Sequence, residues 1–214
     1  RGSVVVESDS DFRSWLDSYP THAEVVAAPA GDPVGGQALY ALCTACHGPE
    51  GQDNPILNSP KISGQSDWYL RRSLQQYKSG VRGTHEDDLF GQQMAPMAAT
   101  LVDDAAINDV VAYINTLPDE PAPITVVGDI ARGEKLYQTC AYCHGGDGQG
   151  IWSVNAPRLS GISDWYLVRQ LSNFKSGIRG PHPADTFGAQ MSWMTTVLSD
   201  EAAINDVVAY INTL

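Results

Sequence analysis

The sequence is poor in cysteine, in basic residues and in long apolar runs. Its 214 residues include four cysteines, and 13 lysines and arginines against 25 aspartates and glutamates, which gives a formal net charge of −12. Because phosphate binding needs clustered basic side chains, this charge argues against a nucleic-acid partner. No apolar stretch approaches the roughly 18–20 residues that span a bilayer. With 43% hydrophobic and 18% charged residues, the composition predicts an acidic globular protein with no membrane span in this fragment.

The first residues lack both an initiator methionine and the charged-then-apolar pattern of an export signal. We therefore expect that any export signal has been removed. Arg1, Gly2 and Ser3 resemble the scar of an expression tag, so the chain from residue 4 onward is predicted to be a piece of a longer protein.

An internal repeat organises most of the chain. Shifting the sequence by 97 positions aligns residues 36–117 with residues 133–214 without a gap, and 47 of the 82 aligned pairs are identical. The segment between the repeats, residues 118–132, opens with the sequence PDEPAP, which predicts a stiff, extended, acidic linker. The sequence therefore predicts two homologous domains, 36–117 and 133–214, preceded by a separate segment, 1–35.

Each repeat is predicted to be all-α. The stretch Asp103–Leu117 places apolar residues at i, i+3, i+4 and i+7, which is the pattern of an amphipathic helix. Its counterpart is predicted to start at Asp200 with Ser199 as N-cap. Alternating strand patterns are scarce. A repeat of 82 residues is small for a self-sufficient core, so we expect each repeat to hold a bound group that fills its interior.

Two further helices are predicted in each repeat, one at its start and one in its middle. For the middle helix we expect an aspartate as N-cap and a glycine just past the last turn. The predicted bounds are residues 36–45 and 133–142 for the first helix, and Asp67 to Gly80 and Asp164 to Gly177 for the middle helix.

Each repeat contains one C-x-x-C-H motif. Two thiols one helical turn apart suit thioether bonds to the two vinyl groups of a haem, and the adjacent histidine then reaches the iron from one face. A redox dithiol is one alternative, but no βαβ pattern surrounds the motif. A zinc site that shares four thiolates between the repeats is another, and it leaves the matched histidines unexplained. The residues predicted to attach two haem c groups are Cys43, Cys46 and His47 in the first motif and Cys140, Cys143 and His144 in the second.

The second iron ligand must come from downstream of each motif. All four methionines of the chain lie in two Met-x-x-Met pairs at matched positions. A methionine opposite histidine raises the reduction potential of a haem, which suits respiratory electron transfer. The glycine and proline of segment 90–97 predict that the first pair lies in a loop. The candidate ligands are Met94, Met97 and His85 in the first repeat and Met191, Met194 and His182 in the second.

Together these motifs resemble the class I cytochromes c, and within them the tandem dihaem type called cytochrome c4. The resemblance covers residues 36–214. It implies that a proline carbonyl after the motif accepts a hydrogen bond from the iron-binding histidine, and Pro60 and Pro157 match this position. It also implies that the first methionine of each pair binds the iron. The implied methionine ligands are Met94 and Met191, with Met97 and Met194 as the alternatives.

The segment before the repeats resembles a different family. Residues 4–16 combine a β-branched run, an acidic turn and the pattern Phe-x-x-Trp-Leu on a predicted short helix. They are similar to the end of the copper-binding domain of cytochrome c oxidase subunit II, which in caa3-type oxidases is followed by one or two cytochrome c domains. The alternative is a disordered acidic leader. Copper itself cannot bind in this fragment, because the two motifs use all four cysteines.

These resemblances imply respiratory electron transfer, with no catalytic residue in this chain. The first interpretation is the dihaem part of an oxidase subunit II, periplasmic and held by a membrane-anchored parent, which passes electrons from a cytochrome c or the cytochrome bc1 complex to the copper centre of a haem-copper oxidase. The second is a free periplasmic shuttle of cytochrome c4 type. A dihaem peroxidase is the third, but it needs an open iron position, which the matched methionines disfavour. In each case an exposed acidic surface is expected to speed docking to a basic partner.

Overall fold

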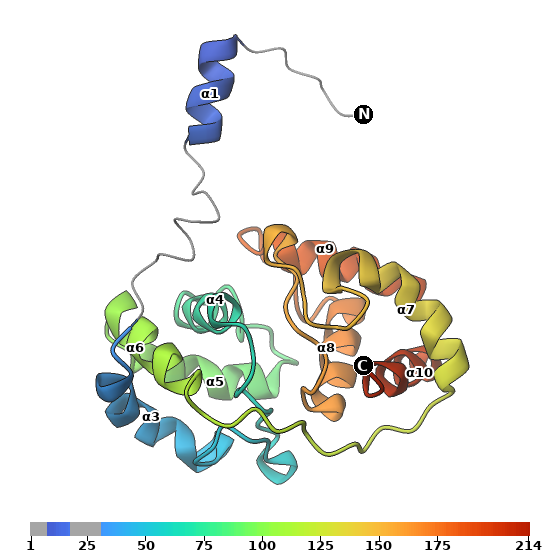
Figure 1. The fold of residues 1–214 in the computed structure, drawn as a ribbon, viewed down its shortest axis with the longest axis horizontal. Coiled ribbons are helices and arrows are strands. Elements are labelled where there is room, and N and C mark those ends of the chain that lie inside the picture. Colours follow the sequence, from blue (N-terminus) through green and yellow to red (C-terminus); the bar gives the residue numbers. More distant parts are fainter. Residues whose placement is uncertain (1–7, 18–30) are drawn as a thin grey trace. The chain divides into compact units, whose positions relative to one another are not determined.

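The computed structural model describes residues 8–17 and 31–214, which belong to two separate compact units (Figure 1). The first unit comprises residues 1–30, and the second comprises residues 31–214. No helix in the described ranges is both long enough and apolar enough to cross a membrane.

The first unit contains one described helix, α1 (Asp9–Asp17). Ser8 Oγ accepts a hydrogen bond from the backbone N–H of Asp11 at 3.2 Å, which satisfies one of the free donors at the start of the helix. The predicted short helix is therefore present, but it starts at Asp9, within the predicted acidic turn. The β-branched run at residues 4–6 and the tag-like residues 1–3 lie outside the described residues.

The second unit consists of two matching sets of helices, a first half (residues 31–117) and a second half (residues 130–214), joined by a linker (residues 118–129). Between residues 31 and 214 there is no strand, only an isolated bridge in each half, so the all-α prediction is confirmed. Short 3₁₀ turns lie at Pro55–Leu57, Trp152–Val154 and Thr195–Val197. The helices are α3 (Pro33–His47), α4 (Asp67–Lys78), α5 (Leu89–Ala99), α6 (Asp104–Ile114), α7 (Ile130–His144), α8 (Asp164–Ser176), α9 (Thr186–Met194) and α10 (Glu201–Ile211).

The first helix of each half starts earlier and ends later than predicted. In α3 the side chain of Asp32 accepts a hydrogen bond from the N–H of Val34 at 2.9 Å. Pro33 takes the first helical position, where a missing N–H costs nothing. The helix then continues to His47, so the whole C-x-x-C-H motif lies on one continuous helix. The second half repeats this arrangement in α7, with Asp129 as N-cap.

The predicted N-caps are wrong by one residue. The last helix, α10, is capped by Asp200, whose carboxylate accepts from the N–H of Ala203 at 2.8 Å, and Ser199 lies outside the helix. The middle helices α4 and α8 begin at the predicted aspartates themselves, and their N-cap residues are Ser66 and Ser163, which make no side-chain capping bond. Serine and aspartate cap almost equally well, so the local sequence does not choose between neighbours.

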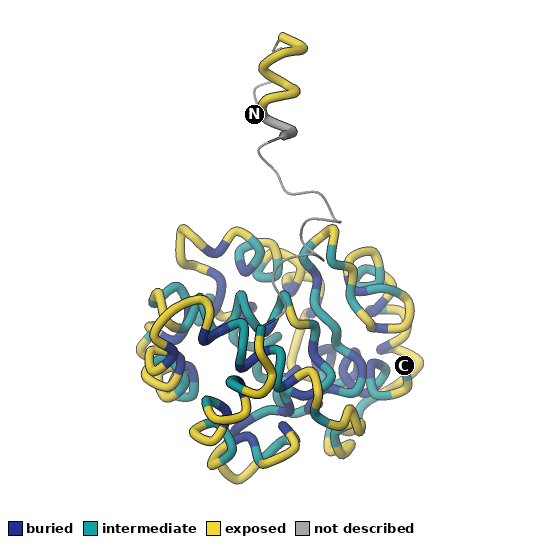
Figure 2. The backbone as a smooth tube through the Cα atoms, turned by 60° about the vertical axis from the view of Figure 1, so that its left-hand side comes forward, coloured by how far each residue is buried: buried dark blue, intermediate teal, exposed yellow. Residues whose placement is uncertain are grey.

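The last helix of each half forms the centre of that half's core. Helix α6 packs on α3, and α10 packs on α7, and their buried residues follow the predicted amphipathic pattern. The helices approach so closely that only glycine fits at the crossing. A Cβ on Gly36 would lie 1.9 Å from the carbonyl oxygen of Asp109, and one on Gly133 would lie 2.0 Å from that of Asp206. Figure 2 shows the buried stretches within this second unit.

Segment 90–97, predicted as a loop, is helical in the structure and belongs to α5. The carboxylate of Asp88 caps the helix by accepting from the N–H of Gly91 at 3.1 Å. Pro96 lies in the last turns and removes a single backbone donor. Ala98, two residues further along the helix, is only 1% exposed, so the helix end is buried on this side.

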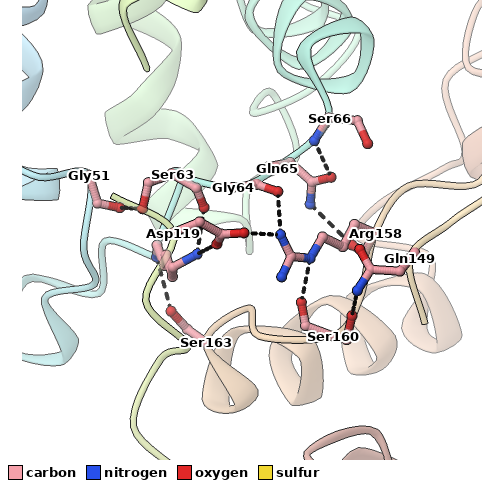
Figure 3. Close-up of polar contacts among 11 residues, drawn as sticks. Gly51, Ser63, Gly64, Gln65, Ser66, Asp119, Gln149, Arg158, Ser160 and Ser163 are labelled. Carbon is pink, nitrogen blue, oxygen red and sulfur yellow. Dashed lines mark hydrogen bonds and ion pairs between the residues drawn. The ribbon is translucent and has the colours of Figure 1, made fainter. Parts of the chain in front are cut away.

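The linker ties the two halves together at its first charged residue. Asp119 forms an ion pair with Lys61 Nζ at 2.7 Å and a second one with the guanidinium of Arg158 (Figure 3). Burial by itself would raise the pKa of Asp119, but the hydrogen bonds and charges of Arg158 and Lys61 outweigh it and hold this pKa below its usual range. One carboxylate of the linker therefore bridges a cation from each half.

A second clamp holds the linker further along. The backbone N–H groups of Thr125 and Val126 donate to the carboxylate of Asp164 at 2.6 and 2.7 Å, and this carboxylate is 1% exposed. The halves also touch directly, since the N–H of Lys61 donates to Ser163 Oγ at 2.9 Å (Figure 3). The structure therefore holds the two halves in one arrangement.

Candidate functional site

The two C-x-x-C-H motifs occupy the last turns of α3 and α7. All four thiols are free; Cys43 and Cys140 are half-buried, whereas Cys46 and Cys143 are exposed. Burial raises the pKa of the Cys140 thiol to about 11 and shifts that of Cys43 in the same direction. In each motif, therefore, one thiol faces the interior and one lies at the surface.

The motif histidines have the same setting in both halves. His47 Nδ1 lies 2.8 Å from the carbonyl oxygen of Pro60, and His144 Nδ1 lies 2.8 Å from that of Pro157. A carbonyl oxygen can only accept, so Nδ1 carries the proton and Nε2 keeps its lone pair. Burial lowers the pKa of both imidazoles, which keeps them neutral and able to bind a metal. The structure thus brings the predicted histidine and proline together in each half.

A cleft opens beside the motif in the first half. It is lined by Cys43, Cys46 and His47 of α3 and by Met94 and Met97 of α5. Segments about fifty residues apart in the sequence therefore meet at one site. The rest of the lining is mainly apolar and includes Leu39, Leu42, Leu70, Leu74, Leu101 and Ile114.

Exposure distinguishes the two methionines of each pair. Met97 is 36% exposed and Met194 is 38% exposed, whereas Met94 and Met191 are half-buried. A thioether that binds a metal inside a cleft must be withdrawn from water. The first methionine of each pair is therefore better placed than the second.

The two other candidate ligands lie elsewhere. His85 does not line the cleft with the cysteines, but lines a separate cavity together with His182. Each of these histidines accepts a backbone N–H at Nδ1, from Asp87 at 3.2 Å and from Ala184 at 3.1 Å. The shared cavity brings together the equivalent loops of the two halves.

Three further residues that line the cleft were not predicted. Tyr69 and Arg82 come from the first half and Tyr166 comes from the second. Arg179, the counterpart of Arg82 in the repeat, lines the separate cavity of His85 and His182. Burial would raise the pKa of Tyr69, but the charges of Arg179 and Arg82 lower it to about 7. In the sequence these residues are marked only because the same tyrosine and the same arginine recur 97 positions later. Many core residues recur in the same way, so this identity does not distinguish site residues from core residues.

The residues present fit a haem. A haem is a flat, mostly apolar macrocycle whose iron binds neutral imidazole nitrogen and thioether sulfur. The cleft offers an apolar wall, two thiols one helical turn apart and an imidazole oriented by a backbone carbonyl. This donor set also argues against zinc, because the thiols of the two motifs do not gather, and no cluster of three or more metal-binding side chains occurs in residues 8–17 and 31–214.

Comparison with known proteins agrees with this chemistry. The family model described as "Cytochrome c" matches residues 34–118 and 130–214. Cytochrome c4 of Azotobacter vinelandii is 33% identical over 165 residues, which cover 72% of this chain and 77% of that protein. Cytochrome c4 of Thiocapsa roseopersicina is 34% identical over 179 residues, which cover 76% and 85%. The crystal structure of reduced recombinant cytochrome c4 from Pseudomonas stutzeri superposes with a TM-score of 0.67 at 28% identity, covering 86% of this chain and 100% of that chain.

Proposed function

Because the chain belongs to the cytochrome c family and carries two covalently bound haem c groups, we propose that it is a periplasmic electron carrier of cytochrome c4 type. The observation that carries this proposal is the matched setting of the two halves. Each has a motif histidine held by a proline carbonyl at 2.8 Å, and each has a methionine pair on the helix that precedes the last one. The proposal therefore assigns both haems the same task.

We propose the following roles for the site residues. In each half the two motif cysteines form the thioether bonds, and the motif histidine binds the iron through Nε2. The half-buried first methionine of each pair supplies the second ligand. The full set is Cys43, Cys46, His47 and Met94 in the first half and Cys140, Cys143, His144 and Met191 in the second.

The chain's own groups explain why such a site would transfer electrons and do little else. A bound haem accepts and releases one electron, and methionine opposite histidine raises its reduction potential. The Pro60 carbonyl holds the tautomer and orientation of His47, which limits rearrangement between the two redox states. Two protein ligands per iron leave no open position for a substrate, which disfavours the peroxidase interpretation.

The oxidase-subunit interpretation has less support than the carrier interpretation. It depends on residues 4–16, of which residues 4–7 lie outside the described part of the chain, while the rest contributes helix α1. The relatives compared above are cytochrome c4 proteins, which favours the free carrier. A cytochrome or a cytochrome-reducing complex as donor, and a terminal oxidase as acceptor, remain the proposed classes of partner. The net charge of −12 favours partners with a basic docking surface.

Paired methionine variants test the proposed ligands. We expect Met94→Ala and Met191→Ala each to convert one of the two haems from low-spin to high-spin in the visible spectrum and to lower one of the two midpoint potentials. Met97→Ala and Met194→Ala are the matched controls, and they should leave the low-spin spectrum unchanged. The ligand assignment is wrong if the controls produce the high-spin signal. A purified wild-type chain without two covalent haems, or with a high-spin haem, would contradict the carrier proposal itself.

A further inference from the structure

Two large aromatic side chains of the second half project into water. Tyr142 is 85% exposed and lies in α7 directly before Cys143, whose thiol is also exposed. Trp193 is 80% exposed and lies in α9 directly before Met194, the second methionine of its pair. Rings of this size are usually withdrawn from water to a much larger extent. We call these two residues the aromatic pair.

The first half lacks the aromatic pair. Its matching positions, 97 residues earlier, are exposed as well, but they hold the much smaller side chains of Ala45 and Pro96. Because both positions are exposed in both halves, core packing does not require an aromatic ring at either one. The aromatic pair therefore points to a task that belongs to the surface of the second half.

The aromatic pair lies at the edge of the second motif's site and not in its wall. In the first half Cys46 of α3 and Met97 of α5 line the cleft, whereas Ala45 and Pro96 next to them do not. The second half has the matching helices α7 and α9 and the same contact of its motif histidine with a proline carbonyl at 2.8 Å. A haem bound in the second half would therefore leave the aromatic pair uncovered.

The chain segments that carry the aromatic pair are uncharged. Residues 136–143, which end with the motif cysteines, and residues 186–199, which contain α9 and the turn after it, include no charged side chain. The exposed charges that flank these segments are those of Lys135, Asp147 and Asp200. An uncharged aromatic centre with a mainly acidic border is typical of a surface that binds another protein.

Charge indicates which protein fits this surface. A second copy of the chain also carries a net charge of −12, so the repulsion between like charges opposes self-association. A protein with an apolar contact area inside a basic border matches both the uncharged centre and its acidic surroundings. Tryptophan and tyrosine are also among the residues that contribute most to binding at protein interfaces.

We propose that Tyr142 and Trp193 form the docking surface for a redox protein with a basic border, and that this partner exchanges electrons with the haem of the second half. This inference rests on the proposed function, since it takes the chain as an electron carrier. In each encounter one electron passes between that haem and the redox centre of the partner, and no bond forms or breaks. The two haems therefore differ in their access to this partner, although their motifs match.

Stopped-flow oxidation of the reduced chain with both haems tests this inference. The probe is ferric mitochondrial cytochrome c, a small basic redox protein, at concentrations below saturation. We expect Tyr142→Ala and Trp193→Ala each to lower the second-order rate constant about fivefold, and to weaken binding of the probe to the same extent in isothermal titration. Ile56→Ala is the matched control, because it removes a 91% exposed apolar side chain beside Leu57 of the first-half cleft. The inference is overturned if the aromatic variants keep the wild-type rate, or if the control slows transfer equally.

Further measurements separate docking from damage to the haem site and from self-association. Hexacyanoferrate(III) is a small oxidant that needs no docking surface, so every variant should reduce it at the wild-type rate, and equal slowing with both oxidants overturns the inference. Tyr142→Phe and Trp193→Phe keep a ring and should keep most of the rate with cytochrome c. A wild-type dimer that Trp193→Ala dissociates in sedimentation velocity would make the surface a self-contact and the inference wrong. A wild-type chain whose two haems both reduce hexacyanoferrate(III) upholds the proposed function whatever the aromatic variants do.

Discussion

Asp119→Asn tests how the linker holds the two halves together. The side chain of Lys61 is 2% exposed, and its ammonium contacts Asp119 at 2.7 Å and the carbonyl oxygen of Ser63 at 2.6 Å. Asp119 also pairs with the guanidinium of Arg158. Replacing this carboxylate by a neutral amide leaves one buried cation and one partly buried cation without a negative partner.

The structure sets the expected size of the loss. Removing one partner of a fully buried ion pair costs about 3–5 kcal/mol, because the remaining charge stays buried. Asp119 is 41% exposed, so water screens the pair, and exposed pairs contribute less than about 1 kcal/mol. Between these limits, we expect Asp119→Asn to lower the free energy of unfolding by about 2 kcal/mol. Lys61→Met removes the buried charge itself, so the double variant should be more stable than Asp119→Asn alone.

Urea unfolding of the chain with both haems measures this difference. The midpoints of wild type, the two single variants and the double variant complete a double-mutant cycle at constant slope. If the double variant is as unstable as Asp119→Asn, the unpaired ammonium is not the cause of the loss. If Asp119→Asn has the wild-type midpoint, the linker carboxylate does not hold the halves together.

Three further predictions follow from single contacts. Gly36→Ala should lower the free energy of unfolding by about 1–3 kcal/mol, since the new Cβ would meet a carbonyl oxygen at 1.9 Å, whereas Gly146→Ala, with nothing within 4 Å, should leave the thermal midpoint unchanged or slightly raised. The pKa of Asp119 is lowered in the folded state, so its contribution is present above the unfolded value of about 3.9 and is lost as the pH falls through the lower folded value; the urea midpoints of wild type and Asp119→Asn should converge there. Asp164→Asn should cost about 1–3 kcal/mol, because an amide group replaces one acceptor of the linker N–H groups, and limited proteolysis should then cut the linker faster.

Local sequence predicted the helices well where a single pattern was present. The last helices, which differ only at their first residue, were found because their apolar residues repeat with helical spacing and an aspartate precedes them. The prediction failed for α5, where Gly91 and Pro96 indicate a loop but the Asp88 cap and a buried face favour a helix. It also misplaced the N-caps where serine and aspartate are adjacent, because either side chain satisfies the same donors.

The sequence by itself determined the number of haem sites, which residues of the two halves correspond to each other, and the residues of the two motifs. Each of these depends on spacing along the chain: thiols one turn apart, a histidine next to them and a repeat of 97 positions. Spacing alone left two methionines per half as candidates for the second ligand, and only the family resemblance favoured Met94 and Met191, because a spacing of three residues does not tell which sulfur is withdrawn from water.

Only the tertiary structure decided what lies between the halves. The contacts of Arg82 with Tyr166 and of Arg179 with Tyr69 join residues more than eighty positions apart, and no local pattern encodes them. Burial then gives these ordinary side chains their importance, since a guanidinium that would be solvated on an open surface must find its polar partners between the halves. Spacing along the chain therefore sets the chemistry of each half, and packing between the halves sets the electrostatic environment that they share.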